Sequence, residues 1–202
     1  CSYPKDAPLP LHEDSIWTGK PVGATGPYGM AKRLLHEACE TYGRQYGLKC
    51  AVLVPANLYG PEDHFEEEKS HVIPAIIRRY VEAKDAGLES VSNWGTGSPT
   101  PEFLHVADAA EAIAIAAEKD VDCVPINLGT GIETSIAELT ELIASTVGYE
   151  GKVEWDTSKP DGQPKRYLDV SRCKELLGFE AKISLEDGIQ ETVEWYRANP
   201  VI

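Results

Sequence analysis

The sequence predicts an α/β fold in which short parallel strands alternate with helices. The prediction rests on three observations. Cys50–Val54 is a continuous apolar run, which is what a strand buried on both faces of a parallel sheet requires. Helical patterns precede and follow this run, and the alternation of strand and helix continues to the end of the chain. No internal repeat or low-complexity segment interrupts this order.

The first half of the chain contains one clear helix–strand unit and a second helix. Residues 1–26 are rich in proline, glycine and polar side chains and predict a long loop. Pro27 is placed to begin a helix and Gly47 to end it, and the apolar strand follows. The polar stretch Asn57–Ser70 predicts a loop, whose last residue can cap a helix that Gly87 ends. The first helix has apolar residues at helical spacing, namely Met30, Leu34, Leu35, Ala38, Cys39 and Tyr42.

The second half of the chain continues the alternation. Ser135 and Glu138 have the spacing of a capping box, so a helix should begin there and end at Gly148. Residues 158–164 predict a loop that contains proline and glycine. The expected strands are Val91–Trp94, Pro125–Leu128 and Lys152–Trp155, and the other expected helices are Ala107–Lys119, Ser171–Leu177 and Leu185–Arg197.

Composition excludes several classes of protein. The 202 residues include 19 Lys and Arg against 33 Asp and Glu, a net charge of −14, which argues against a nucleic-acid partner because phosphate binding needs a basic stripe. The apolar runs are too short to cross a membrane. Five widely spaced cysteines without a CxxC motif predict reduced thiols in the cytoplasm. The chain opens on Cys1 rather than on Met, and we expect it to be a piece of a longer protein.

Tyr28 and Lys32 form the first candidate catalytic pair. Their spacing of four residues places the phenol and the ammonium group on the same side of a helix. A nearby positive charge favours the phenolate and so lowers the pKa of a tyrosine, which suits proton transfer to a carbonyl or alcohol. Taken alone, the same spacing is more often a solvated pair on a surface.

The chain has no glycine fingerprint for a dinucleotide. Gly95-Thr-Gly97 and Gly129-Thr-Gly131 lack the third glycine and the strand–turn–helix context that such a fingerprint needs. The sequence therefore contains no cradle for a dinucleotide pyrophosphate.

Several motifs occur in an order that makes coincidence a poor explanation. They are Cys1-Ser-Tyr-Pro4, Tyr28-Gly-Met-Ala-Lys32, Pro55–Pro61, Glu102–Val106 with Asp108, Asn127–Gly131, Leu168–Arg172 and Leu176–Gly178. With these motifs the chain resembles the extended short-chain dehydrogenase family along essentially all of its length.

The resemblance implies a fold and a division into domains. The expected architecture is the C-terminal part of a Rossmann-like parallel sheet domain plus a smaller α/β substrate-binding domain. Residues 1–65 and about 107–130 would form the remainder of the dinucleotide-binding domain. Residues of about 66–106 and 131–202 would form the substrate-binding domain.

Three stretches narrow the resemblance to the GDP-L-fucose synthase family, namely Cys1–Lys5, Ser70-His-Val-Ile-Pro-Ala75 and Ser158–Gly162. The resemblance implies an NADP-dependent epimerase–reductase that converts GDP-4-keto-6-deoxy-D-mannose to GDP-L-fucose, acts as a homodimer and needs no metal. The family's acid–base pair for epimerisation carries over to Cys1 and His71. Without the resemblance, Cys1 could be an inert small apolar residue and His71 a histidine at a helix start.

The resemblance also gives roles to the other site residues. Tyr28 would polarise the 4-keto oxygen, and Lys32 would hold the nicotinamide ribose of NADPH and lower the pKa of Tyr28. Ala56 stands where the family has a threonine, a minor departure. The cofactor-binding residues implied are Tyr28, Lys32, Pro55, Ala56, Asn57, Leu58 and His71.

The substrate contacts implied are Arg79, Trp94 and Asp161. An arginine that the family has just before Glu102 is Pro101 here, and proline has neither a charge nor a donor. Either Arg78, Lys165 or Arg166 replaces that contact, or the substrate is that of a related nucleotide-sugar epimerase or reductase. A non-catalytic partner or scaffold that kept the fold is the alternative from another class.

Overall fold

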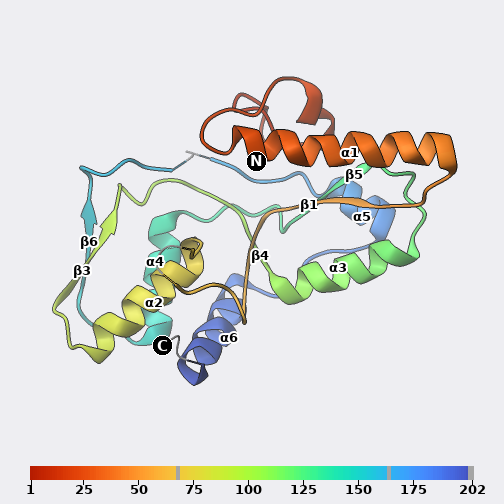
Figure 1. The fold of residues 1–202 in the computed structure, drawn as a ribbon. Helices are drawn as coiled ribbons and strands as arrows, with labels where there is room; N and C mark the ends of the chain where they lie inside the picture. The colour runs from red at the N-terminus through yellow and green to blue at the C-terminus, as the bar shows by residue number, and fades with distance from the viewer. Residues whose placement is uncertain (67–68, 163–164, 200–202) are drawn as a thin grey trace. The chain divides into compact units, whose positions relative to one another are not determined.

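The computed structural model describes residues 1–66, 69–162 and 165–199, and in it the chain divides into two compact units (Figure 1). Unit 1 comprises Cys1–Ala56, Asp108–Ile132 and Arg166–Ala181. Unit 2 comprises Asn57–Ala107, Glu133–Lys165 and Lys182–Ile202. Each unit is formed by three separate stretches of the chain, and each has its own buried apolar cluster.

Unit 1 is organised around two parallel strands, β1 (Val52–Pro55) and β5 (Pro125–Leu128). Helix α1 (Gly26–Tyr46) leads into β1, and helix α3 (Val106–Glu118) leads into β5. A parallel pair needs such crossover connections, so the alternation in the sequence and the topology agree. Two further elements of this unit contact β5, namely the 3-10 helix η1 (Glu13–Trp17) and helix α5 (Ser171–Leu177).

Helix α1 confirms the predicted helix, but its buried side is unexpected. Gly47 ends it with a φ of 68°, and its amide donates to the Gly43 carbonyl at 2.9 Å. Leu34 and Leu35 are 69% and 59% exposed, whereas Arg33 is only 4% exposed. Helical periodicity therefore predicted the element correctly, while the side of the helix that packs against unit 1 is polar.

The described residues of unit 2 form two parallel strand pairs and three helices. The strand pairs are β2 (Asn57–Tyr59) with β4 (Phe103–His105) and β3 (Ser90–Trp94) with β6 (Lys152–Asp156). The helices are α2 (Val72–Asp85), α4 (Ile136–Val147) and α6 (Leu185–Ala198), and α4 contacts both others.

The core of unit 2 consists of apolar and aromatic side chains from these helices and strands. Phe65, which is fully buried, stacks on Tyr196 with ring centroids 4.5 Å apart. Ile77 and Leu139 bring α2 and α4 into the same cluster. Unit 2 therefore has a hydrophobic core of its own, and the burial of this apolar surface is the main source of its stability.

The predicted capping box of α4 is confirmed. The Ser135 hydroxyl accepts from the Glu138 amide at 3.1 Å, and the Glu138 carboxylate accepts from the Ser135 amide at 2.9 Å. Gly148 ends the helix in the left-handed region, with a φ of 74°. The other predicted elements of the second half are present within one residue or so at each end, including β3, β6 and α6.

Three local predictions were wrong. Residues 1–26 contain the 3-10 helix η1, and the stretch predicted as a loop after residue 56 begins with strand β2. Strand β2 depends on β4, 45 residues away in sequence, since the Asn57 side chain and amide both donate to the Glu102 carbonyl. Ser70 does not cap α2, because the N-cap position belongs to His71 in an extended conformation.

The predicted domain limits and the observed units differ at two segments. Residues 57–65 belong to unit 2, where β2 pairs with β4 and Phe65 is in the core. Residues 166–181 belong to unit 1, where Leu168 packs with Tyr3 and α5 contacts β5. The assignment of one unit to the cofactor and the other to the substrate stays a prediction. Within the described residues, no helix has the length and apolar character that a membrane span requires.

Candidate active site

Tyr28 and Lys32 lie one turn apart near the start of α1. The Lys32 Nζ atom is 5.2 Å from the centroid of the Tyr28 ring, which places the cation over the phenol. Tyr28 is 57% exposed and Lys32 is exposed as well. The helix therefore presents a phenolic proton donor and an ammonium group together, and both are open to a ligand.

Cys1 lies against the same helix. Cys1 is exposed, and its carbonyl oxygen contacts Gly29, the residue after Tyr28. A Cβ atom at position 29 would stand 2.2 Å from that oxygen, so only glycine permits this approach. The structure thus brings Cys1 and Tyr28 to the same end of α1 within unit 1.

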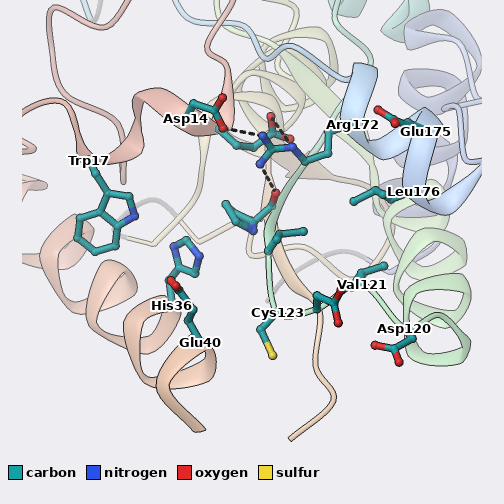
Figure 2. A pocket seen from close by; sticks show the side chains of 14 residues that line it. Asp14, Trp17, His36, Glu40, Asp120, Val121, Cys123, Arg172, Glu175 and Leu176 are labelled. Carbon is teal, nitrogen blue, oxygen red and sulfur yellow. Dashed lines mark hydrogen bonds and ion pairs between the residues drawn. The ribbon is translucent and has the colours of Figure 1, made fainter. Parts of the chain in front are cut away.

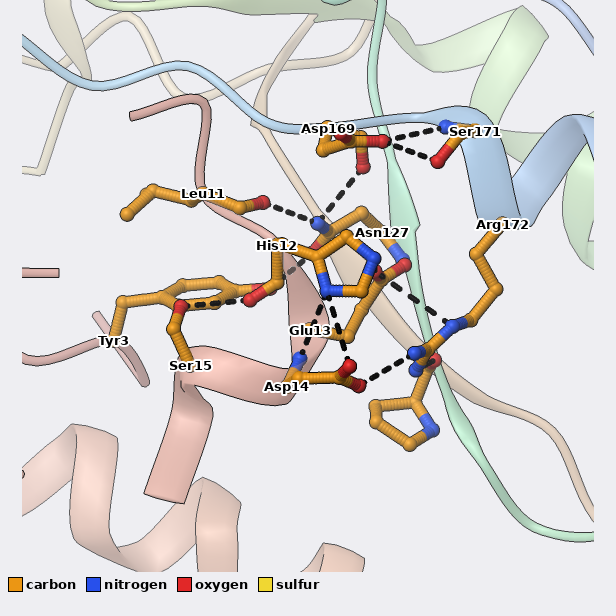
Figure 3. A network of polar contacts seen from close by, with 11 residues as sticks. Tyr3, Leu11, His12, Glu13, Asp14, Ser15, Asn127, Asp169, Ser171 and Arg172 are labelled. Atoms are coloured by element: carbon orange, nitrogen blue, oxygen red, sulfur yellow. Dashed lines mark hydrogen bonds and ion pairs between the residues drawn. The ribbon is translucent and has the colours of Figure 1, made fainter. Parts of the chain in front are cut away.

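Asn127, at the centre of β5, holds the segment that follows Cys1 (Figure 3). The Tyr3 hydroxyl donates to Asn127 Oδ1 at 2.5 Å, and Asn127 Nδ2 donates to the carbonyls of Leu11 and Asp169 at 2.7 and 2.9 Å. The Asn127 amide donates to Glu13 Oε1 at 2.7 Å. Asn127 is fully buried, so the N-terminal segment, β5 and the segment before α5 are joined at one residue.

Arg172 completes this network by neutralising buried charge. Its Nε atom is 3.8 Å from Glu13 Oε2, and its Nη2 atom donates to Asp14 Oδ1 at 2.6 Å. The hydrogen bond from Arg172 lowers the pKa of Asp14 below its ordinary value. A buried carboxylate such as Glu13 is tolerated only with partners of this kind. Glu13 and Arg172 therefore act as structural anchors of η1.

A cavity of about 610 Å³ lies beside Arg172 in unit 1 (Figure 2). Trp17 and His36 face each other on one side of it, with ring centroids 5.8 Å apart. Burial lowers the pKa of His36, which favours its neutral form. None of the predicted site residues lines this cavity, so the candidate site and the cavity are different places.

Pro55 is the last residue of β1, Ala56 follows it, and Asn57 and Leu58 begin β2. The Ala56 amide donates to the Leu128 carbonyl at 2.8 Å, which extends the β1–β5 pairing by one residue. The Asn57 side chain donates to the Glu102 carbonyl at 2.8 Å, while Leu58 is 37% exposed. Within these four residues, the Leu58 side chain is therefore available to a ligand, and the Asn57 amide supports the backbone.

His71 belongs to unit 2, at the N-cap of α2. Its side chain is 78% exposed, and its Nδ1 atom is 4.0 Å from Asp63 Oδ1. A carboxylate at this distance can help to orient the imidazole ring. Asp63 was not identified from the sequence, because nothing in a polar loop distinguishes one aspartate from its neighbours.

Arg79, Trp94 and Asp161 are brought together around the end of β3. Arg79 donates to Asn93 Oδ1 at 3.1 Å, directly before Trp94, which is 70% exposed. The Asp161 carboxylate accepts from the Thr96 amide and hydroxyl, each at 2.8 Å. Each of the three predicted substrate residues thus lies in or contacts the stretch from Asn93 to Thr96, but Asn93 is buried and Trp94 exposed, so Arg79 and the Trp94 ring lie on opposite faces of β3.

Asn93 and Lys159 are further residues of this cluster that the sequence analysis missed. Asn93 is 3% exposed, and besides accepting from Arg79 it donates to the Tyr80 hydroxyl at 2.8 Å. The Lys159 Nζ atom is 5.8 Å from the centroid of the Trp94 ring. For Asn93, the sequence signal was an asparagine near the end of a predicted strand.

Pro101 leaves the expected arginine position without a cation. The residues proposed as replacements have protein partners instead: Arg78 pairs with Glu82 at 2.7 Å, and Lys165 pairs with Glu133 at 2.6 Å. Arg166 belongs to unit 1, where it donates to the Pro4 carbonyl at 3.4 Å. Replacement of the missing contact by one of these side chains would require it to leave a present partner.

Comparison with known proteins places the chain in a family. Residues 1–129 match the model of the NAD dependent epimerase/dehydratase family. A probable GDP-L-fucose synthase of Oryza sativa subsp. japonica is 42% identical over 201 residues, all of this chain and 61% of the relative. The chain thus spans about three fifths of the length of this relative.

Two solved structures are similar over nearly the whole chain. A GDP-L-fucose synthetase of Naegleria fowleri bound to NADP has a TM-score of 0.90 and 28% identity, with 98% of this chain and 64% of that chain covered. A GDP-D-glycero-L-gluco-heptose synthase of Campylobacter jejuni, solved with NADPH, has a TM-score of 0.83 and 29% identity, with coverages of 98% and 67%. The match of the family model, the shared fold and the grouped motif residues lead to one conclusion: the chain belongs to the NAD dependent epimerase/dehydratase family.

Proposed function

We propose that the protein to which this chain belongs is an NADPH-dependent epimerase–reductase that converts GDP-4-keto-6-deoxy-D-mannose to GDP-L-fucose. The observation that carries the proposal is the placement of Cys1 and Tyr28 at the same end of α1, with Lys32 one turn further along. A reductase alone needs the tyrosine and the lysine but has no use for a thiol there. The similarity of the whole chain to GDP-L-fucose synthases supports the same assignment.

Epimerisation is the first half of the proposed reaction. The 4-keto group makes the protons at C3 and C5 acidic, provided that the enolate oxygen is stabilised. The exposed hydroxyl of Tyr28 is the donor for that oxygen. Inversion needs a base and an acid, and the thiol of Cys1 and the imidazole of His71 have reference pKa values within about two units of neutrality.

Reduction is the second half. NADPH supplies the hydride to C4 when it is bound. The donor groups on the helix fit its nicotinamide–ribose end, since the Lys32 ammonium can hold the ribose hydroxyls and Tyr28 can donate the proton to the C4 oxygen. Pro55, Ala56 and the exposed Leu58 supply apolar surface for the nicotinamide ring. The pyrophosphate end has no glycine-rich cradle in this sequence.

The cluster at the end of β3 is the proposed site for the nucleotide sugar. Arg79 supplies a positive charge for a phosphate and is oriented by Asn93. The exposed ring of Trp94 can pack on a sugar or base. Asp161 shapes the adjacent turn through its hydrogen bonds to Thr96.

Two further properties belong to the same proposal. We propose a homodimer, supported by the exposed apolar residues of α1, of which Leu34 and Leu35 are the most exposed leucines. We also place the protein in the cytoplasm, supported by the free thiols of the cysteines.

The test is solvent deuterium incorporation at C3 and C5 of the substrate by the full-length protein. Wild type should incorporate deuterium at both carbons. Cys1→Ser and His71→Gln should lose this exchange and still bind NADPH, since neither residue belongs to a glycine-rich turn of the kind that holds a pyrophosphate. Serine is a poor replacement because its hydroxyl is a much weaker acid than a thiol. Wild-type product without solvent deuterium would show that the epimerase half of the proposal is wrong.

A second candidate function is a related nucleotide-sugar epimerase or reductase with another sugar. Pro101 favours it, because one cation expected near the substrate is missing and the possible replacements are paired elsewhere. The similarity to the heptose synthase of Campylobacter jejuni is in line with this candidate. Comparison of kcat/KM for GDP-4-keto-6-deoxy-D-mannose and for a GDP-4-keto-heptose separates the two functions.

A further inference from the structure

The guanidinium group of Arg33 is buried directly beside the predicted catalytic residues. Arg33 follows Lys32 on α1 and is 4% exposed. Its Nε atom donates to the Ser2 carbonyl at 2.8 Å, and its Nη1 atom donates to the Gly19 carbonyl at 2.7 Å. Within the described part of the chain, its Nη2 atom has no hydrogen-bond partner. Trp17 covers it, with the guanidinium carbon 5.4 Å from the ring centroid.

This arrangement is unusual for a residue with only a packing role. Burial of an arginine is costly unless a carboxylate balances its charge, yet the described partners of Arg33 are backbone carbonyls and an aromatic ring. Burial accordingly lowers the pKa of Arg33. An apolar side chain of similar length would fill the same space without that cost. What an apolar side chain could not do is bind the carbonyls of Ser2 and Gly19.

Gly29 makes the second contact between α1 and the Cys1 segment. The Cys1 carbonyl oxygen lies where a Cβ atom of residue 29 would be, at 2.2 Å, and Pro21 Cβ is 3.0 Å from the same point. Residues 29 and 33 are four apart, as are Tyr28 and Lys32, so the two pairs form adjacent rows along the helix. One row carries the reactive groups, and the other row receives the peptide groups of Cys1 and Ser2.

We propose that Gly29 and Arg33 are positioning residues that fix the Cys1–Ser2 backbone on α1 and thereby set the place of the Cys1 thiol relative to Tyr28. The proposal rests on the proposed function, in which Cys1 exchanges protons with the substrate. Cys1 takes part in epimerisation and not in hydride transfer. Loss of the positioning contacts should therefore slow the first step selectively.

The experiment compares two rates in the full-length protein for Arg33→Met. The first is solvent deuterium exchange at C3 and C5. The second is NADPH oxidation with the 4-keto-sugar already epimerised. We expect exchange to fall by about 10- to 100-fold, the effect of a small misplacement of a reacting group, and reduction to change by less than about threefold. Arg44→Met is the matched control, because Arg44 lies on the same helix but is exposed and pairs with the surface residues Glu37 and Glu40. It should change neither rate.

A second variant and a second measurement guard against loss of folding. Gly29→Ala favours the helix intrinsically but displaces the Cys1 peptide, so it should show the same selective loss. Iodoacetamide alkylation of Cys1, with Cys39 as the internal reference thiol, should change in rate in both variants. Equal losses of exchange and reduction, or unchanged exchange and alkylation, would overturn the proposal. If the wild type incorporates no deuterium, and the alkylation rate of Cys1 still differs between the wild type and the variants, the proposed function is contradicted and the positioning role stands.

Discussion

Tyr28 and Tyr3 show, at the scale of single residues, how the same side chain can serve two purposes in unit 1. Tyr28 is 57% exposed beside Lys32, whereas Tyr3 is 3% exposed and donates to Asn127. Burial, with a further contribution from the charge of Glu13, raises the pKa of Tyr3 above its ordinary value. Tyr3 therefore keeps its proton and anchors the chain, and Tyr28 is the tyrosine that can exchange a proton with a ligand.

Replacement of Tyr28 by phenylalanine tests this distinction. The change removes the proton donor and leaves the ring over which Lys32 lies. In the full-length protein, reduction should fall by about two to four orders of magnitude, the range for a positioned proton donor. NADPH affinity should change little. Single-turnover reduction and calorimetry measure the two quantities, and near-normal reduction would remove Tyr28 from the mechanism.

Asn127 should be far more important for stability than its size suggests. Asn127→Ala removes three side-chain hydrogen bonds at a fully buried site and leaves the Tyr3 hydroxyl and two carbonyls without their partner, while the backbone amide keeps its bond to Glu13. We expect a loss of about 3 kcal/mol in the free energy of unfolding for Asn127→Ala and about 1 kcal/mol for Tyr3→Phe. Urea titration of both variants gives the comparison. Equal effects of the two changes would show that the Leu11 and Asp169 carbonyls find other partners.

At the scale of elements, what could be predicted from the sequence depended on how local the stabilising contacts are. Helix α4 was predicted correctly because its capping residues, Ser135 and Glu138, are three apart in the chain. Strand β2 was missed because its partner, β4, lies 45 residues away. The buried side of α1 was missed for the same reason, since Arg33 is buried by contacts to residues near the start of the chain.

The candidate site divides in the same way. Tyr28 could be proposed from its spacing to Lys32, whereas Cys1 and His71 were proposed through the resemblance to a family, and all three roles stay predictions. Asn93 accepts a hydrogen bond from Arg79, and Asp63 lies near His71. Only these tertiary contacts mark the two residues as part of the site. Their residue types are common in loops and at strand ends, so the sequence gives no means of selecting them.

The apolar side of α1 leads to a prediction about assembly. Leu34 and Leu35 are 69% and 59% exposed side by side on α1, and adjacent exposed apolar side chains of this kind are typical of an interaction surface. A charge placed in an interface between two copies would be buried without a partner, so Leu34→Glu in the full-length protein should convert dimers to monomers. Leu88→Glu, at a 52% exposed leucine after α2, is the matched control and should leave the mass unchanged. Sedimentation equilibrium gives the masses, and a dimeric Leu34→Glu variant would exclude this side of α1 as the interface.

At the scale of the whole molecule, the net charge of the chain and the positions of its local cations have opposite effects on the binding of an anionic ligand. The chain carries a charge of −14, which repels nucleotides at long range. Local cations offset this repulsion at the proposed site: Lys32 on α1, and Arg79 and Lys159 around the end of β3. Each unit therefore presents its own positive groups within an acidic surface, and short-range contacts must account for nucleotide binding.

This balance predicts how the 202-residue chain by itself should treat NADPH. A dinucleotide is normally held by its pyrophosphate, which accepts hydrogen bonds from backbone amides of a glycine-rich turn at a helix N-terminus. The sequence contains no such turn after a strand, so only contacts such as those of Tyr28 and Lys32 with the nicotinamide ribose remain. We expect no saturable binding of NADPH at micromolar concentrations by calorimetry. The acidic surface should make any residual binding stronger as salt is added, because screening weakens the repulsion.

A longer form of the protein that includes the residues preceding Cys1 is the control and should bind at micromolar concentrations. Saturable micromolar binding by the 202-residue chain would mean that its own residues hold the phosphates, and the cofactor site would then have to be sought among the basic side chains of the two units.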